Sequence, residues 1–301
     1  MKKSVIYLSL LLVTSFVMSC SSDDDATTAP TTQDITLNIS GLEDLGSGYA
    51  YEGWILVDGS PVSTGTFTVD GGGNLSQTSF VVDIASVQSA TKFILTIEPS
   101  PDSDPSPSTQ KLIAGDFSGA TANVSTSVEP AIGDFSNAAG SFFLRTPTDE
   151  MPGSANNGND QYGVWFGIPG MPPTASLDLP TLPTGWTYEG WVVGDSGALS
   201  TGTFTDFAAM DDNAGMGFNG TAQIGPPIPG EDFFNNAPEG ETFPLDIRGR
   251  TVVISVEPVP DNSPAPFLLK PLLATAGNDT APTTHSFGQN LESLPTGTVI
   301  R

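Results

Sequence analysis

The chain has 301 residues, with 9 Lys and Arg against 34 Asp and Glu, and its formal net charge at pH 7 is −25. An acidic balance this strong repels nucleic acid, so we expect no nucleic-acid partner. Only 14% of the residues are charged, while Gly (33) and Pro (26) are abundant, a composition typical of an all-β protein with many short strands and turns.

The first residues are typical of an export signal. Two lysines precede an apolar run from Val5 to Val17 that is too short for an ordinary membrane span. The run ends in Val-Met-Ser-Cys, which resembles the lipobox of bacterial lipoprotein precursors. That resemblance implies that residues 1–19 are a signal peptide, removed before Cys20, and that the Cys20 sulfur is acylated.

Cys20 is the only cysteine in the chain. The exported chain therefore has no cysteine left for an internal disulfide or a CxxC metal site. Several acyl chains, each stabilised by about 0.8 kcal/mol per buried methylene, would anchor the protein permanently. We expect a membrane to be its first partner.

Residues 20–33 are polar and form an acidic, flexible tether. Asp23, Asp24 and Asp25 resemble the acidic export signal that some Gram-negative bacteria place just behind a lipidated cysteine. This resemblance implies an outer-membrane lipoprotein exposed at the cell surface. The alternative is a solvated linker on a lipoprotein that faces the periplasm.

The chain carries an internal repeat. The sequence "YEGWILVDGSPVSTGTFT" at 51–68 returns as "YEGWVVGDSGALSTGTFT" at 188–205, and "IEPSPDSDPSP" at 97–107 returns as "VEPVPDNSPAP" at 256–266. The offset grows from 137 to 159 residues between the two blocks, so the second copy has a 22-residue insertion.

Alternating apolar residues around the repeated blocks predict strands. Both faces of 51–57 carry apolar groups, which indicates a central strand. We therefore predict two tandem related β-sandwich domains, at 34–134 and 135–301. The second gains an N-terminal hairpin from 140–149 and 162–170 that extends its sheet, and helix is expected only as a short turn within 231–238.

The strand and turn at 51–67, followed by "FILTIEPSPDSDPSPS" at 93–108, resembles the extracytoplasmic domain of anti-sigma-K factors. Both copies carry the motifs in the same order. The resemblance implies a β-rich fold outside the cytoplasm. In that family a cytoplasmic segment grips a sigma factor. We expect this chain to lack it, so that at most a sensing or protein-binding role carries over.

Catalytic chemistry has few candidate residues. His285 is the only histidine, which excludes multi-histidine zinc sites. It lies near the C-terminus without a suggestive neighbour in sequence, so we expect no histidine-based triad either. Glu52 and Glu189 could form a carboxylate pair, but duplication alone explains their likeness. For Glu98 and Glu257 we expect hydrogen bonds from the loop that follows each. We expect no enzyme and no resident cofactor.

Calcium is the one ion for which candidate ligands exist, because it needs only clustered oxygens. Asp211, Asp212 and Asn213 in the insertion are the main candidates, and further oxygen-rich loops lie at 102–104 and 156–160. None has the spacing of an EF-hand loop. The alternative for each is a solvated turn.

Trp165, Trp186 and Trp191 gather in the second domain and could form a platform for glycan stacking. The alternative is that they are core aromatics. The sequence thus predicts a surface-displayed, non-catalytic envelope protein, for binding of a protein or glycan or for structural display. An extracytoplasmic accessory of an anti-sigma type sensing system is the alternative.

Overall fold

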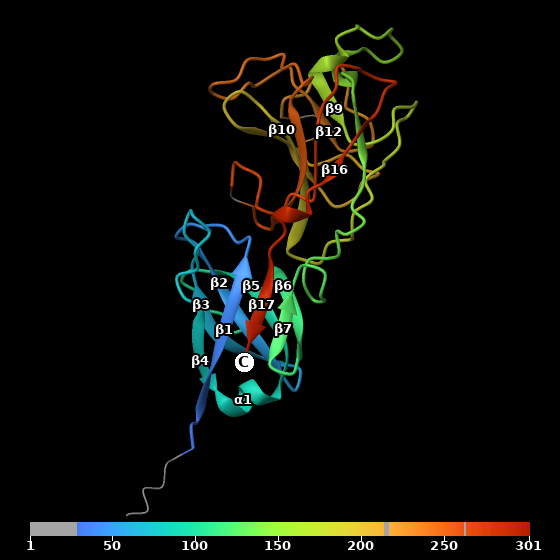
Figure 1. The fold of residues 1–301 in the computed structure, drawn as a ribbon. Helices are drawn as coiled ribbons and strands as arrows, with labels where there is room; N and C mark the ends of the chain where they lie inside the picture. The colour runs from blue at the N-terminus through green and yellow to red at the C-terminus, as the bar shows by residue number, and fades with distance from the viewer. Residues whose placement is uncertain (1–28, 214–216, 262) are drawn as a thin grey trace, which may run out of the picture. The chain divides into compact units, whose positions relative to one another are not determined.

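The computed structural model describes residues 29–213, 217–261 and 263–301 (Figure 1). All the helices and strands reported below belong to one compact unit, Thr31–Arg301. Cys20 and the aspartates Asp23, Asp24 and Asp25 lie outside the described residues. Within the described ranges, no helix has the length and apolar character needed to cross a membrane.

Strands dominate the described residues, which confirms the predicted all-β fold. Helix is limited there to α1 (Ile84–Ser89) and to the 3-10 turns η1 (Pro147–Asp149), η2 (Asp160–Tyr162) and η3 (Leu291–Ser293). The side chain of Asp83 caps α1 by accepting from the Ser86 amide at 2.9 Å. Six residues are too few to show a helical period, so α1 could not be predicted from the apolar pattern.

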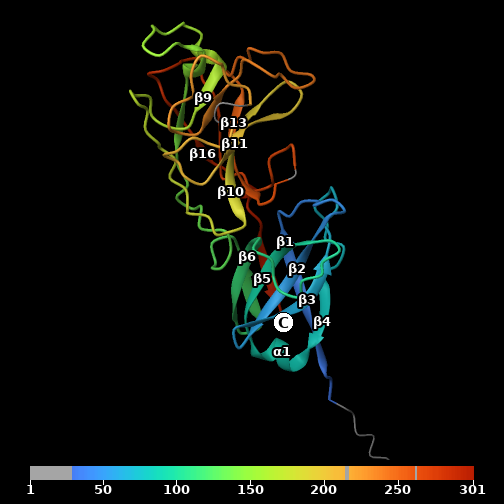
Figure 2. The same cartoon turned by 180° about the vertical axis from the view of Figure 1, so that it is seen from behind.

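An eight-stranded antiparallel sheet contains the first repeat. In spatial order its strands are β3 (Ser60–Phe67), β2 (Tyr49–Val57), β5 (Ala90–Pro99), β6 (Lys111–Ser118), β7 (Thr121–Val124), β17 (Thr296–Ile300), β1 (Thr32–Ser40) and β4 (Ser79–Asp83). The sheet is curved. β1, β17 and β7 lie in front in Figure 1, whereas β2, β3 and β5 lie in front in Figure 2, which shows the molecule from behind.

Both faces of β2 are covered, as its apolar pattern predicted. Tyr51 and Ile55 enter the main core, which fills the inside of the curved sheet. Trp54 points to the other face and packs with Ile94, Ala114 and Ala131. β2 lies between β3 and β5, so it is a central strand.

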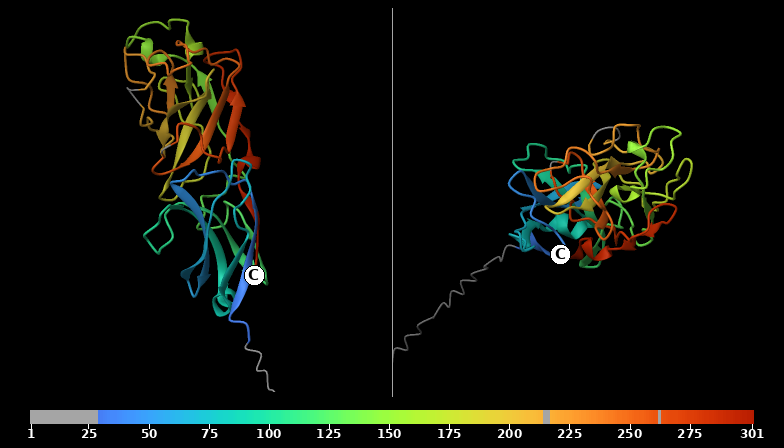
Figure 3. Two further views of the ribbon diagram at one scale, coloured as in Figure 1. Left: turned by 90° about the vertical axis from the view of Figure 1, so that its left-hand side faces the viewer. Right: turned by 90° about the horizontal axis from the view of Figure 1, so that it is seen from above.

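The C-terminal strand does not belong to the predicted domain. The prediction placed all of 135–301 in the second domain. β17 pairs instead with β1 and β7 in the sheet of the first repeat, where Val299 lies opposite both Leu37 and Ala122. Figure 3 shows this red strand beside the blue β1. β17 joins two strands that would otherwise leave exposed edges, an advantage that the local pattern of 296–300 does not reveal.

Two smaller sheets contain the second repeat. One has the order β11 (Ala198–Phe204), β10 (Trp186–Val193), β13 (Thr251–Pro258), β14 (Leu272–Thr275), β16 (Gly288–Gln289). The other has the order β12 (Gly230–Asp232), β9 (Gly163–Trp165), β8 (Ser141–Leu144), β15 (His285–Ser286).

The extra hairpin forms as predicted, through pairing of β8 with β9. It does not extend the sheet of the repeat, because it pairs with β12 and β15 in a sheet of its own. The insertion supplies β12, so the predicted helical turn within 231–238 is wrong. Pairing with β9 gives the backbone of β12 an extended conformation in place of a helical one.

The repeated hairpin has the same geometry in both copies. β2 and β3 shift register between Gly53 and Trp54, and β10 and β11 shift between Gly190 and Trp191. In each bulge a Cβ on the glycine would lie 2.4 or 2.3 Å from a threonine hydroxyl. The glycine of the repeated "YEGW" sequence therefore lies at a bulge where a side chain would not fit.

Candidate functional site

Each repeat places two glutamates and one aspartate at matching positions. We call Glu52, Glu98 and Asp102 the first acidic cluster, and Glu189, Glu257 and Asp261 the second acidic cluster. In each cluster the first glutamate lies on the central strand of the hairpin and the second on the neighbouring strand, β5 or β13. The aspartate lies in the proline-rich loop that follows.

A chain of hydrogen bonds fixes the second glutamate of the first cluster. The Trp54 indole donates to the Thr96 hydroxyl at 2.9 Å, and that hydroxyl donates to Glu98. Glu98 also accepts from the Ser108 amide at 2.9 Å, and Lys111 donates to the Ser108 carbonyl at 3.0 Å.

The same chain recurs in the second repeat. The Trp191 indole donates to the Ser255 hydroxyl at 2.8 Å, and Ser255 donates to Glu257. The Phe267 amide donates to Glu257 at 3.0 Å, while Lys270 donates to the Phe267 carbonyl at 2.6 Å. The prediction that both glutamates accept hydrogen bonds from the following loop is therefore confirmed.

The two clusters differ at the first glutamate. Ser63 donates to Glu52 and Ser200 donates to Glu189, so each has one oxygen engaged. The other oxygen of Glu189, Oε2, is buried without a hydrogen-bond partner. Carboxylate oxygens of Glu189, Glu257 and Asp261 lie within 4.8 Å of one another, and no other trio of acidic, His or Cys side chains in the described ranges meets this spacing.

Burial raises the pKa of both glutamates of the second cluster. Desolvation, together with the charges of Glu257 and Asp261, raises the pKa of Glu189 to about 8. Desolvation raises the pKa of Glu257 to about 7, although hydrogen bonds from Ser255 and Phe267 oppose it. Near neutral pH the two glutamates therefore bind protons unless a cation replaces them.

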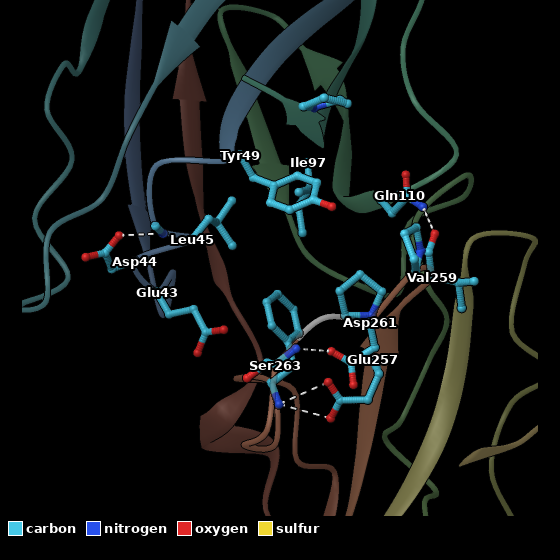
Figure 4. A pocket seen from close by; sticks show the side chains of 15 residues that line it. Glu43, Asp44, Leu45, Tyr49, Ile97, Gln110, Glu257, Val259, Asp261 and Ser263 are labelled. Carbon is cyan, nitrogen blue, oxygen red and sulfur yellow. Dashed lines mark hydrogen bonds between the residues drawn. The ribbon is translucent and has the colours of Figure 1, made fainter. Parts of the chain in front are cut away.

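A cavity of about 530 Å³ adjoins the second acidic cluster and has walls from both repeats. Figure 4 shows Leu45, Tyr49 and Ile97 of the first repeat on one side, with Glu257 and Asp261 on the other.

A hydrogen bond from Gln110 to the Val259 carbonyl, 2.5 Å long, joins the two repeats at the cavity. The walls are apolar, whereas Glu43, Asp44, Glu257 and Asp261 give the lining four carboxyl groups. This combination suits a ligand that has apolar and cationic groups.

The two predicted calcium-binding aspartates of the insertion are engaged in hydrogen bonds within the protein. Asp211 is buried and accepts from the Gly230 amide at 2.8 Å and the Asn213 amide at 3.1 Å. Asp212 is exposed and accepts from the amide and hydroxyl of Thr203 at 2.6 and 2.9 Å. The two aspartates thus hold their own loop in place, and the structure favours the turn interpretation for them.

The three tryptophans proposed for glycan stacking lie in the core. Trp165, Trp186 and Trp191 are only 2, 3 and 2% exposed. Trp165 donates to Asp232 at 3.0 Å, and Trp191 donates to Ser255. A buried indole face cannot stack on a sugar, so the structure favours the core interpretation.

The structure also contains groups that the sequence interpretation missed. Glu231 is fully buried and both its carboxylate oxygens lack a hydrogen-bond partner. The meeting of Asp261 with Glu189 was missed too, although the matching acidic positions of the two repeats were a usable signal. For Glu231 the sequence offered no such signal, because its burial depends on the folding of the insertion.

Comparison with known proteins gives one family. Residues 25–111 match the family described as "Anti-sigma-K factor rskA, C-terminal". No curated protein and no solved structure matches the chain. The matched segment includes β1 to β5 and the whole first acidic cluster, whereas the second repeat is related to it through the internal duplication. The first repeat therefore carries an anti-sigma-K-like C-terminal domain.

Proposed function

We propose that this protein is a lipid-anchored, non-catalytic lipoprotein of the outer membrane. It displays a duplicated anti-sigma-K-like module at the cell surface and binds a ligand there. The observation that carries the binding role is the cavity of about 530 Å³ where the two repeats meet. A duplication that served architecture alone would not need an open, apolar cavity with a carboxyl-rich lining.

The lining indicates the class of ligand. Apolar groups of Leu45, Tyr49 and Phe267 suit an aliphatic or aromatic side chain, and Glu43 and Asp44 suit a positive charge. The formal net charge of −25 would attract a basic partner from a distance. We favour a protein ligand that presents a Lys or Arg next to an apolar side chain, and a glycan is the alternative.

The proposed anchor rests on Cys20 and is tested by metabolic labelling. Cells that express the protein and grow with radiolabelled palmitate should incorporate the label into it. The substitution Cys20→Ser should abolish the labelling. The variant should also leave the outer-membrane fraction. Equal labelling of Cys20→Ser and the unaltered protein would refute acylation at this residue.

The proposed ligand site is tested by filling the cavity. Val259 lines it and is 47% exposed, so Val259→Trp should block entry without removing a core side chain. Val81, which is 69% exposed and not part of the lining, provides the matched control Val81→Trp. In an array of basic peptides and glycans, binding should fall at least tenfold for Val259→Trp alone. Equal binding by both variants would place the ligand elsewhere.

The family match favours a second candidate function, an accessory of an envelope sensing system. On that proposal the module would bind a membrane-embedded regulator. Deletion of the gene would then change the activity of a sigma-factor-dependent reporter, and Val259→Trp would reproduce the change. An unaltered reporter in the deletion strain would exclude this role.

A further inference from the structure

We propose that the second acidic cluster, formed by Glu189, Glu257 and Asp261, binds a divalent cation of the calcium class. This inference concerns the ion alone and does not depend on the ligand proposed for the cavity. The site uses residues of the repeat itself and none of the Asp211–Asn213 loop of the insertion.

The spacing of the oxygens is the first argument. Two oxygens that bind one Ca²⁺ at about 2.4 Å can be at most about 4.8 Å apart. Mg²⁺ is usually bound through only one or two carboxylates, so a set of three favours the calcium class. The three carboxylate oxygens lie within 4.8 Å of one another. Their chemistry agrees, because carboxylates are hard oxygen ligands and no sulfur or imidazole takes part.

The second argument is the oxygen that lacks a partner. Glu189 is 5% exposed, and its Oε2 has no hydrogen-bond partner. Leaving such an oxygen buried and unpaired is unfavourable, so it needs either a proton or a cation. Lys270, whose charge acts on Glu257, donates to the Phe267 carbonyl. None of the ion pairs among the described residues involves the cluster.

The surroundings allow an ion to enter and complete its coordination. Glu257 and Asp261 line the cavity (Figure 4), and the partly exposed Asp261 gives the cluster access to solvent on that side. Ca²⁺ takes roughly 6–8 oxygen ligands, and water in the cavity can supply those that the three carboxylates do not. The hydrogen bonds from Ser200, Ser255 and Phe267 hold two of the carboxylates in place before the ion binds.

The first acidic cluster is a control within the same molecule. It has the same three residue types at matching positions, with Ser63 on Glu52 as Ser200 is on Glu189. Its three carboxyl groups do not meet the spacing that the second cluster meets, and Asp102 is exposed. Sequence alone would assign an ion to both repeats or to neither, whereas the geometry assigns it to the second.

Calorimetry tests the assignment. Purified protein stripped with EDTA is titrated with CaCl₂ at pH 7.5, as the unaltered chain and as the variants Glu189→Gln and Glu52→Gln. We expect one saturable site in the unaltered chain and in Glu52→Gln, and at least tenfold weaker binding in Glu189→Gln. Absence of binding in the unaltered chain, or equal binding by Glu189→Gln, would overturn the proposal. Tighter binding of MgCl₂ than of CaCl₂ would overturn the calcium class.

Terbium luminescence tests the same site without altering a ligand. Trp191 is linked to Glu257 through Ser255, so its indole is close enough to sensitise Tb³⁺ bound at the second cluster. CaCl₂ should displace Tb³⁺ and remove the emission. The emission should fall severalfold in Trp191→Phe and persist in Trp54→Phe. Loss in Trp54→Phe alone would place the ion at the first cluster and contradict the assignment. An absence of sensitised emission from the unaltered chain would do so as well.

Discussion

At Glu231 the fold buries a carboxyl group whose two oxygens have no hydrogen-bond partner. Desolvation, together with the nearby charges of Asp211 and Asp232, raises its pKa to about 10. Glu98 and Glu257 are buried too, but each accepts hydrogen bonds from its own loop. Burial is thus compensated at the repeated glutamates and is not compensated at Glu231.

Glu231 should make the protein less stable as the pH rises. Its folded pKa exceeds the unfolded value, so its stabilising contribution is complete below about pH 4.5 and is lost progressively toward pH 10. The variant Glu231→Gln has no proton to lose. We expect it to be more stable than the unaltered chain by about 1–3 kcal/mol at pH 8 and nearly equal at pH 4.5.

Urea unfolding followed by tryptophan fluorescence at the two pH values measures this difference. A Glu231→Gln variant that is less stable at pH 8 would show that Glu231 is ionised and paired in the folded protein. Asp211→Asn, which alters a partnered neighbour, provides a comparison. It should lose stability because Asp211 accepts from the amides of Gly230 and Asn213.

The roles of single residues could be predicted where the same residue occurs at matching positions of the two repeats. The hydrogen-bonding role of Glu98 and Glu257 could be predicted because each precedes the same proline-rich loop. For Trp191 the sequence left two alternatives open, glycan stacking and a core position, and the structure favours the core position. The fate of Glu231 could not be predicted, because an acidic residue in a polar insertion is ordinarily solvated.

At the scale of elements, the bulge in the repeated hairpin depends on its glycine. A Cβ at Gly190 would lie 2.3 Å from both Phe166 and the Thr201 hydroxyl. Gly190→Ala should therefore destabilise the protein by about 1–3 kcal/mol through overpacking. Gly197, in the turn of the same hairpin, has open space at its Cβ, and Gly197→Ala should be nearly neutral. Thermal unfolding of both variants measures this, and equal losses would show that space around the bulge is not the constraint.

The C-terminal strand β17 should contribute to the stability of the first sheet through one face only. Val299 is fully buried between β1 and β7, whereas its neighbour Ile300 is 42% exposed. Val299→Ala should lower the free energy of unfolding by about 1.5–3 kcal/mol, and Ile300→Ala should change it far less. Chemical denaturation provides the values. Equal effects of the two substitutions would contradict the pairing of β17 described above.

Most strands could be predicted because their apolar residues alternate and are bounded by Gly and Pro, as in β2 and β5. The partners of the strands could not, since pairing depends on chain segments that are distant in sequence. β17 joins the first sheet although 171 residues separate Val124 of β7 from Thr296. β12 is buried at every position. It could not be predicted, because two of its residues, Glu231 and Asp232, are acidic.

For the molecule as a whole, the proposed binding role depends on the cavity where the two repeats meet. The cavity takes its walls from Leu45, Tyr49 and Ile97 in one copy and from Glu257 and Phe267 in the other. No property of either copy alone predicts it. The duplication and the acidic charge could be predicted from the sequence, and the proposal of a binding module outside the cytoplasm is based partly on them.

Treatment of intact cells with a non-permeant protease tests whether the protein is displayed at the cell surface. We predict that both repeats are digested while a periplasmic control protein stays intact. Changing Asp23, Asp24 and Asp25 to Asn should make the chain resistant if these residues direct its export. Protection of the unaltered chain on intact cells, followed by digestion once the cells are lysed, would contradict surface display.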